Sequence, residues 1–155
     1  MTCIHKEILI DAEPAAVWDA LSDWGALHTR LVPGFVIDTK LDGGDRIVTF
    51  ANGAVVREVM LDRDHTARRL AWTIVDGPYA HHSAAAQVHP AGSGRSRFVW
   101  VADVLPESSA EQTGAMMAQG TAIVKQTLER DGDGDGDGDG ATLDIGAGAG
   151  AAIQP

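Results

Sequence analysis

Residues 97–130, RFVWVADVLPESSAEQTGAMMAQGTAIVKQTLER, decide the fold of this chain, because a strand pattern changes there into a helix pattern. The first part alternates between two kinds of side chain, as the two faces of a β-strand do. One face carries Phe98, Trp100, Ala102 and Val104, which we assign to the interior. Pro106 then ends the strand.

A long helix is predicted after this proline. Ser108 or Ser109 can cap its first turn, and Glu111 or Gln112 would complete a capping box. The helix should run to about Arg130 and end where an Asp-Gly run begins. Its predicted inward-facing residues are Met116 or Met117, Gly120, Ile123, Val124 and Leu128.

Short apolar segments separated by turn sequences occupy the region from residue 35 to residue 106. The first of them, residues 35–41, follows a Pro-Gly turn. Turns rather than helices between the segments favour an antiparallel meander. The turn sequences, rich in Gly, Asp, Asn and Pro, are residues 42–45, 52–53, 62–64, 76–78 and 90–94.

The N-terminal part predicts one strand followed by two short helices. Isoleucines among alternating polar residues between positions 4 and 10 indicate the first strand. Residues 13–21 predict a helix with a proline at its start. Its apolar face consists of Val17, Trp18 and Leu21. Gly25 interrupts it, and a second helical turn follows over residues 26–30.

These elements predict an α+β fold, with a curved antiparallel seven-stranded β-sheet, a long C-terminal α-helix and two short helices after the first strand. A parallel sheet is excluded because its strands need crossover helices between them, and none is available. The long helix must therefore cover one face of the sheet.

Composition divides the chain into one domain and a tail. A chain of 155 residues with 45% hydrophobic residues can bury one core. Residues 131–155 are mainly Gly, Asp and Ala, so little would offset the entropy cost of ordering their backbone. We predict one domain over residues 1–130 and a disordered tail over residues 131–155.

Charge and hydropathy argue against several partners. The net charge is −10, or −4 for residues 1–130, because six aspartates lie in the tail. A mildly acidic domain without a basic cluster disfavours nucleic acid. No apolar run approaches the roughly 20 residues that span a bilayer. We expect a cytoplasmic protein, monomeric or weakly homodimeric, with no membrane insertion and no nucleic-acid partner.

The sequence indicates neither a metal site nor a cofactor. Cys3, the single cysteine, can form no internal disulfide, and we interpret it as a small core residue of the first strand. His81 and His82 are adjacent on a predicted strand, so they point to opposite faces and cannot chelate one metal. Nucleophilic catalysis lacks support because no Gly-x-Ser-x-Gly motif exists.

Five segments, in their order and spacing, carry a resemblance to a known family. They are residues 12–25 (AEPAAVWDALSDWG), 33–34 (PG), 57–58 (RE), 68–72 (RRLAW) and 94–100 (GRSRFVW). Over about residues 3–130 the chain resembles the START-like or Bet v 1-like (SRPBCC) superfamily, particularly its polyketide cyclase/dehydrase and lipid-transport branch. The resemblance implies a helix-grip fold with a deep cavity between the concave sheet face and the long helix, used in the superfamily for lipids, sterols, hormones and polyketides.

Strand alternation and the family pattern together predict the residues that face this cavity. Periodicity alone is ambiguous for residues 55–61, where the family pattern selects Val56, Glu58 and Met60. The small Ala84 and Ala86, facing a helix with Gly120, would leave volume for a ligand. The predicted ligand-binding residues are Arg46, Val48, Phe50, Val56, Glu58, Met60, Trp72, Ile74, His82, Ala84, Phe98, Trp100, Met116, Gly120, Ile123 and Val124.

The turn around residues 52–53 leaves two registers open for its hairpin. A three-residue loop over residues 52–54 would set Val48 opposite Glu58. A two-residue Asn-Gly turn would instead set Val48 opposite Arg57.

Three polar residues are predicted among these apolar neighbours. A buried charge costs several kcal/mol unless it is paired, so Arg46 and Glu58 form a structural ion pair, recognise a ligand or take part in acid–base catalysis. His82 is the best candidate for moving a proton near neutral pH. Trp72 and Trp100 can stack on a flat ligand. The other two tryptophans, Trp18 and Trp24, are more typical of core contacts.

The favoured function is binding of a small hydrophobic molecule, lipid-like or polyketide-like, with Arg46, Glu58 and His82 as polar anchors. The alternative is a cofactor-independent cyclase or dehydratase in which His82 or Glu58 shuttles protons as the catalytic group. A third class, an adaptor that binds another protein with the outer sheet face, lacks an evident exposed apolar stripe.

Overall fold

A seven-stranded antiparallel sheet carries the fold, and the computed structural model describes it within residues 1–137. The strands are β1 (Thr2–Ile10), β2 (Val36–Asp42), β3 (Asp45–Phe50), β4 (Val55–Asp64), β5 (Arg69–Val75), β6 (His81–Pro90) and β7 (Ser96–Leu105). Their spatial order is β1-β7-β6-β5-β4-β3-β2. The first strand therefore pairs with the last, and the predicted fold class is confirmed.

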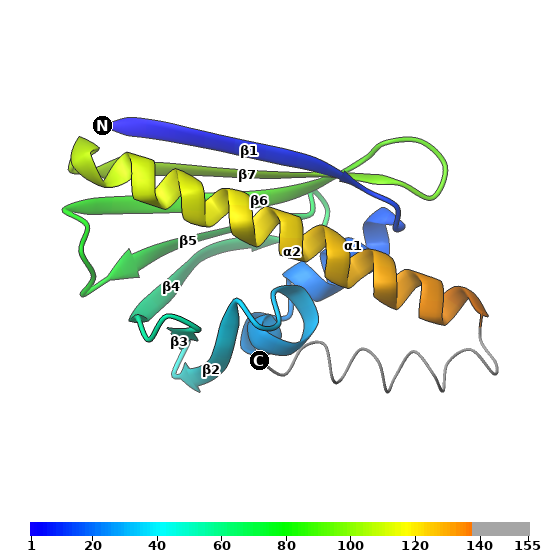
Figure 1. Ribbon diagram of the computed structural model, residues 1–155, viewed down its shortest axis with the longest axis horizontal. Helices are drawn as coiled ribbons and strands as arrows, with labels where there is room; N and C mark the ends of the chain where they lie inside the picture. Colours follow the sequence, from blue (N-terminus) through cyan, green and yellow to red (C-terminus); the bar gives the residue numbers. More distant parts are fainter. Residues whose placement is uncertain (138–155) are drawn as a thin grey trace.

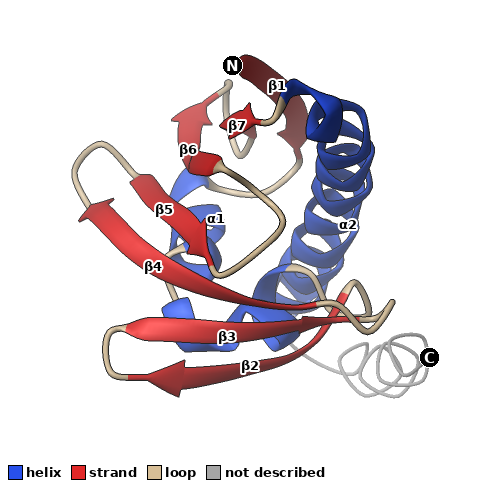
Figure 2. Cartoon of the chain, turned by 90° about the vertical axis from the view of Figure 1, so that its left-hand side faces the viewer, coloured by secondary structure: helices blue, strands red, loops and turns tan. Residues whose placement is uncertain are grey.

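Helical segments cover the concave side of this sheet. They are α1 (Pro14–Leu21), a 3-10 turn η1 (Trp24–Ala26), a π-helical turn η2 (Leu27–Leu31), a 3-10 turn η3 (Glu107–Ser109) and α2 (Ala110–Asp137). Figure 1 shows α2 running beside β1 and β7. In Figure 2 the sheet curves away from these strands, and α2 lies across its open side.

The long helix is anchored to β1 by both apolar and polar contacts. Met117 and Val124 are fully buried on its inner face. Lys125 Nζ donates to the carbonyl of Leu9 at 2.8 Å, and Glu129 accepts from the N–H of Asp11 at 2.9 Å. Because α2 follows this edge of the sheet, it does not cover the concave face of the more distant strands.

The hairpin between β3 and β4 adopts neither of the two predicted registers. Arg46 pairs with Glu58 and Val48 with Val56. The turn centres on Asn52, whose side chain accepts from the N–H of Ala54. This register differs by two residues from the one predicted for a three-residue loop. An even shift keeps every side chain on its face, so the predicted inward positions hold.

Both ends of α2 differ from the prediction. The 3-10 turn Glu107–Ser109 precedes it, so Ser108 and Ser109 lie within a helical turn rather than at a cap. The helix continues past Arg130 to Asp137, the last residue that the structure describes. Extending a formed helix costs far less than nucleating one, which lets poor helix formers follow the anchored turns. The disorder of the tail stays a prediction, and its residues 138–155 lie outside the described residues.

Cys3 is exposed and is not the core residue that we predicted. It pairs with Asp103 on the outer face of β1, whereas Ile4, Ile8 and Ile10 alternate onto the inner face. The strand was predicted correctly, and the face of its cysteine was not.

Two glycines of α2 provide a test of how tightly the helix approaches the sheet. A Cβ on Gly114 would meet Ile4 at an ordinary 3.7 Å, whereas a Cβ on Gly120 would lie 3.1 Å from the Trp100 ring. Gly114→Ala should raise the free energy of unfolding by about 0.5–1 kcal/mol through helix propensity. Gly120→Ala should gain less or lose stability, because Trp100 must move. Urea unfolding of both variants measures this, and equal gains would contradict the close approach.

Candidate functional site

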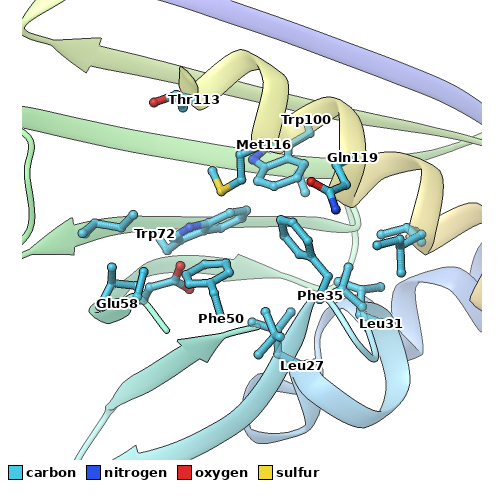
Figure 3. A pocket seen from close by; sticks show the side chains of 18 of the residues that line it. Leu27, Leu31, Phe35, Phe50, Glu58, Trp72, Trp100, Thr113, Met116 and Gln119 are labelled. Carbon is cyan, nitrogen blue, oxygen red and sulfur yellow. The ribbon is translucent and has the colours of Figure 1, made fainter. Parts of the chain in front are cut away.

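A cavity of about 850 Å³ lies between the concave face of the sheet, α2 and the η2 turn. Figure 3 shows aromatic side chains from the sheet facing Met116 and Gln119 of the helix, with Leu27 and Leu31 below them. Most of its lining residues are apolar. Arg46 and Glu58 are the charged side chains among them, together with the titratable His82.

Most of the predicted site residues line this cavity. They are Arg46, Phe50, Val56, Glu58, Trp72, Ile74, His82, Phe98, Trp100, Met116, Ile123 and Val124. Side-chain alternation places the strand residues of this set on the concave face, and Met116, Ile123 and Val124 reach the cavity from α2. Their contact with a ligand stays a prediction.

Four predicted site residues do not line the cavity. Val48 is completely buried, and Ala84 is enclosed between Trp72 and Ala102 of the neighbouring strands. Met60 packs against the core opposite Trp72. Gly120 lies against the rings of Trp100 and Phe35, which fill the volume that we had assigned to a ligand there. Large aromatic side chains therefore lie beside Ala84, Met60 and Gly120, whereas Val48 is enclosed in the core.

Several lining residues were not predicted as part of the site. Leu27 and Leu31 come from η2, Phe35 follows the Pro-Gly turn, and Tyr79 lies in the loop between β5 and β6. Helix α2 adds residues spaced three or four apart, which belong to one helix face. Gln112, Thr113 and Gln119 were not predicted, and they share this face with the predicted Met116 and Ile123. The spacing of these residues can be read from the sequence. Because three of them are polar, the face they form was not recognised as part of an apolar cavity.

Aromatic rings form much of the cavity wall. The Trp72 and Trp100 ring centroids lie 6.2 Å apart with planes tilted by 43°. Phe35 and Phe50 meet edge to face at 5.6 Å. Such rings present wide apolar surfaces at a small cost in side-chain entropy. The other two tryptophans do not line the cavity: Trp18 donates to His65, and Trp24 donates to the carbonyl of Gly44.

Arg46 and Glu58 form a buried ion pair across β3 and β4. The two side chains are 4% and 8% exposed, and both the Nε and the Nη2 of Arg46 contact Glu58 Oε1, at 2.8 and 2.7 Å. Arg46 Nη1 also donates to the carbonyl of Trp24, and its guanidinium carbon lies 3.7 Å from the centroid of the Trp24 ring. The pair thus connects the sheet to η1 at one end of the cavity.

His82 is held by the backbone of the neighbouring strand. Its Nδ1 accepts from the N–H of Ile74 at 3.1 Å, and its ring lies 5.0 Å from that of Tyr79. Burial, helped by the charge of adjacent His81, lowers the pKa of His82 from 6.5 to about 4. The imidazole is therefore neutral at physiological pH. The hydroxyl groups of Tyr79 and Thr113 hydrogen-bond to each other at 2.8 Å.

Residues 1–137 contain neither a metal-ligand cluster nor a membrane-spanning helix. No three His, Cys, Asp or Glu side chains gather there as a metal ion would require. No helix of that part of the chain has the length and apolarity needed to cross a membrane.

The fold and its cavity agree with a comparison to known families. The model of the family described as polyketide cyclase / dehydrase and lipid transport matches residues 1–130. The chain belongs to this family. The resemblance to the START-like superfamily is therefore confirmed, and the family supports a role in ligand binding or cyclisation. No curated protein matches the chain significantly.

Solved structures show the same fold for members of this superfamily. XoxI from Bacillus cereus is 17% identical with a TM-score of 0.75, over 83% of this chain and 96% of that one. A START superfamily protein from Mycobacterium smegmatis is 12% identical with a TM-score of 0.62, over 80% and 97%. The di-domain ARO/CYC protein BexL is 17% identical with a TM-score of 0.70, over 83% of this chain and 47% of that one. At these identities the likeness concerns the fold.

Breaking the Arg46–Glu58 pair should be costly, because a single substitution leaves one buried charge uncompensated. Glu58→Leu should lower the free energy of unfolding by about 3–5 kcal/mol. The double variant Arg46→Met/Glu58→Leu should be clearly more stable than Glu58→Leu. Arg57→Met, which removes two partly exposed ion pairs, with Asp42 and Asp45, on the other face of β4, is the control and should cost far less. Urea unfolding of these three variants and of Arg46→Met completes the double-mutant cycle, and additive losses of the two single variants in the double variant would contradict the coupling.

The low pKa of His82 makes stability depend on pH. The unfolded chain takes up a proton at this side chain from about pH 6.5 downward, whereas the folded protein resists until about pH 4. The contribution is thus fully present above pH 6.5 and is lost as the pH falls toward 4, by at most about 1.4 kcal/mol per pH unit. His82→Gln lacks this titration. The difference in unfolding free energy between wild type and variant should shrink across that window, and a constant difference would contradict it.

Proposed function

We propose that this protein binds a small, neutral, apolar molecule in the cavity between its sheet and α2, and acts as a carrier. The observation that carries the proposal is the cavity of about 850 Å³ lined chiefly by apolar and aromatic side chains. Pockets of this size and lining are typical of sites that enclose a drug-sized or lipid-like ligand. The description of the family to which the chain belongs includes lipid transport, which supports a carrier function.

The electrostatics of the cavity favour a neutral ligand. Its charged lining residues, Arg46 and Glu58, compensate each other at hydrogen-bond distance. Arg46 also turns toward Trp24. We propose that the pair acts as a structural ion pair of the wall. A charged ligand would enter a low-dielectric space without a free counter-ion, at a considerable desolvation cost.

The remaining lining groups suit a ligand with flat or flexible apolar parts. Trp72, Trp100 and Phe50 offer ring faces on the sheet side, and Met116 offers an adaptable thioether on the helix side. We propose that these four side chains make the main apolar contacts. The cyclase alternative needs a positioned base, and the Nδ1 of His82 already accepts a backbone hydrogen bond. This geometry favours the carrier function over the enzyme.

The test is binding of the neutral fluorescent probe N-phenylnaphthylamine, whose emission rises in an apolar site. Wild type should bind it, and Ile123→Trp should weaken binding by tenfold or more, because the added indole fills the cavity that Ile123 lines. Ala122→Trp is the matched control, since the neighbouring Ala122 is exposed on the other side of α2. It should bind like wild type. Both variants must keep the circular dichroism of the folded protein.

Absence of probe binding by wild type, or equal loss in both variants, would contradict the proposal. The natural ligand can be sought by mass spectrometry of organic extracts from the purified protein. A neutral apolar compound is expected in the wild-type extract and should be depleted in the Ile123→Trp extract.

A further inference from the structure

The wall of the cavity changes its hydrogen bonding where β5 and β6 separate. Their backbone pairing runs from Arg69 opposite Gln87 to Trp72 opposite Ala84 and ends there. Beyond this point the two strands are joined by hydrogen bonds between side chains and backbone instead of by backbone pairing. The Thr73 hydroxyl donates to the carbonyl of His82, and the N–H of Ile74 donates to His82 Nδ1. The imidazole of His82 is thus clamped to the backbone of β5.

This clamp determines which ring nitrogen carries the proton. A backbone N–H can only donate, so Nδ1 must present its lone pair to Ile74. In a neutral imidazole the proton then lies on Nε2. The lowered pKa agrees with a neutral ring. Within residues 1–137 Nε2 makes no hydrogen bond, although His82 lines the cavity and is 6% exposed. Nε2 is not among the fully buried polar atoms that lack a partner, so its N–H is accessible to a molecule in the cavity. An acceptor placed there would gain a hydrogen bond to a donor of fixed direction.

We propose that the ligand carries a carbonyl oxygen, and that His82 Nε2–H donates a hydrogen bond to it. This inference rests on the proposed function, because it assigns one polar group of the molecule that the cavity would enclose. The clamp fixes the ring, so the donor is oriented before the ligand enters. An apolar ketone, quinone or ester has the acceptor that the site lacks.

The charge on the neighbouring strand favours a neutral acceptor over a carboxylate. Glu58 of β4 pairs directly with Ile74, the residue that clamps His82. Its carboxylate therefore belongs to the same part of the wall, and Arg46 contacts only one of its oxygens, Oε1. A ligand carboxylate beside Glu58 would be repelled by it. The nearby cation, Arg46, is already paired with Glu58 and would not compensate the second charge. A carbonyl accepts the same hydrogen bond without this cost.

The same geometry bears on the alternative of acid–base catalysis by His82. With Nδ1 occupied by the Ile74 N–H, neither ring nitrogen presents a lone pair to the cavity. His82 can polarise a bound carbonyl as a donor, but it cannot remove a proton from the ligand in this arrangement.

Fluorene and fluorenone provide a matched pair of probes, because they share one flat ring skeleton and differ by the carbonyl. The quantity to measure is the Kd of fluorene divided by the Kd of fluorenone, from quenching of tryptophan fluorescence. This ratio should be about tenfold larger for wild type than for His82→Phe, which keeps an aromatic ring and removes the donor. Comparing ratios cancels the different solubilities of the probes. His81→Phe, on the exposed face of the same strand, is the control and should keep the wild-type ratio.

The outcomes separate this inference from the proposed function. If both probes bind and the ratio is equal in wild type and His82→Phe, the carbonyl assignment is overturned and apolar binding stands. If neither probe binds wild type, both proposals fail. A second measurement needs no substitution at the site: nitrogen NMR of the wild-type ring at neutral pH should find Nε2 protonated and Nδ1 bare, with fluorenone but not fluorene shifting the Nε2 signal. A ring protonated at Nδ1 would overturn the inference.

Discussion

One helix cannot cover a seven-stranded sheet, and the rest of this structure follows from that constraint. Seven strands spaced by about 4.8 Å span roughly 30 Å, whereas a helix with its side chains is about 10 Å wide. Helix α2 packs along β1, with Met117, Val124 and Leu128 as its buried seam. The concave face of β3 to β6 therefore needs another cover. Curvature and the η2 turn supply part of it and enclose a cavity in the remaining space.

The polar side chains of the cavity wall have their charges and hydrogen bonds satisfied largely by groups on neighbouring strands. Arg46 and Glu58 are direct neighbours across β3 and β4, so their charges cancel within the wall. His82 is held in place where the pairing of β5 and β6 ends, and its lone pair is used there. What remains is a neutral, mostly apolar surface on which His82 Nε2–H is a donor held in a fixed direction, together with the unpartnered indole N–H of Trp100. These features together make neutral apolar ligands with an acceptor group the chemistry that the cavity fits.

Much of the fold and part of the site could be predicted from local pattern. The alternation of Phe98, Trp100, Ala102 and Val104 predicted their inward face, because side-chain direction in a strand has a period of two. Because of this period, the predicted inward direction of Arg46 and Glu58 remained correct although the hairpin register differed by two residues. Cys3 shows the limit of such reasoning, since a small apolar residue fits either face of an edge strand.

The sequence by itself determined the strands, the turns, the antiparallel class and the set of side chains on the concave face, since these depend on residues a few positions apart. Tertiary structure decided which of those side chains border empty space. Ala84 and Gly120 are small, yet Trp72, Trp100 and Phe35 fill the volume beside them. It also decided the tautomer of His82, through an N–H on another strand. Cavities and proton positions arise from packing between distant segments, and no local periodicity records that packing.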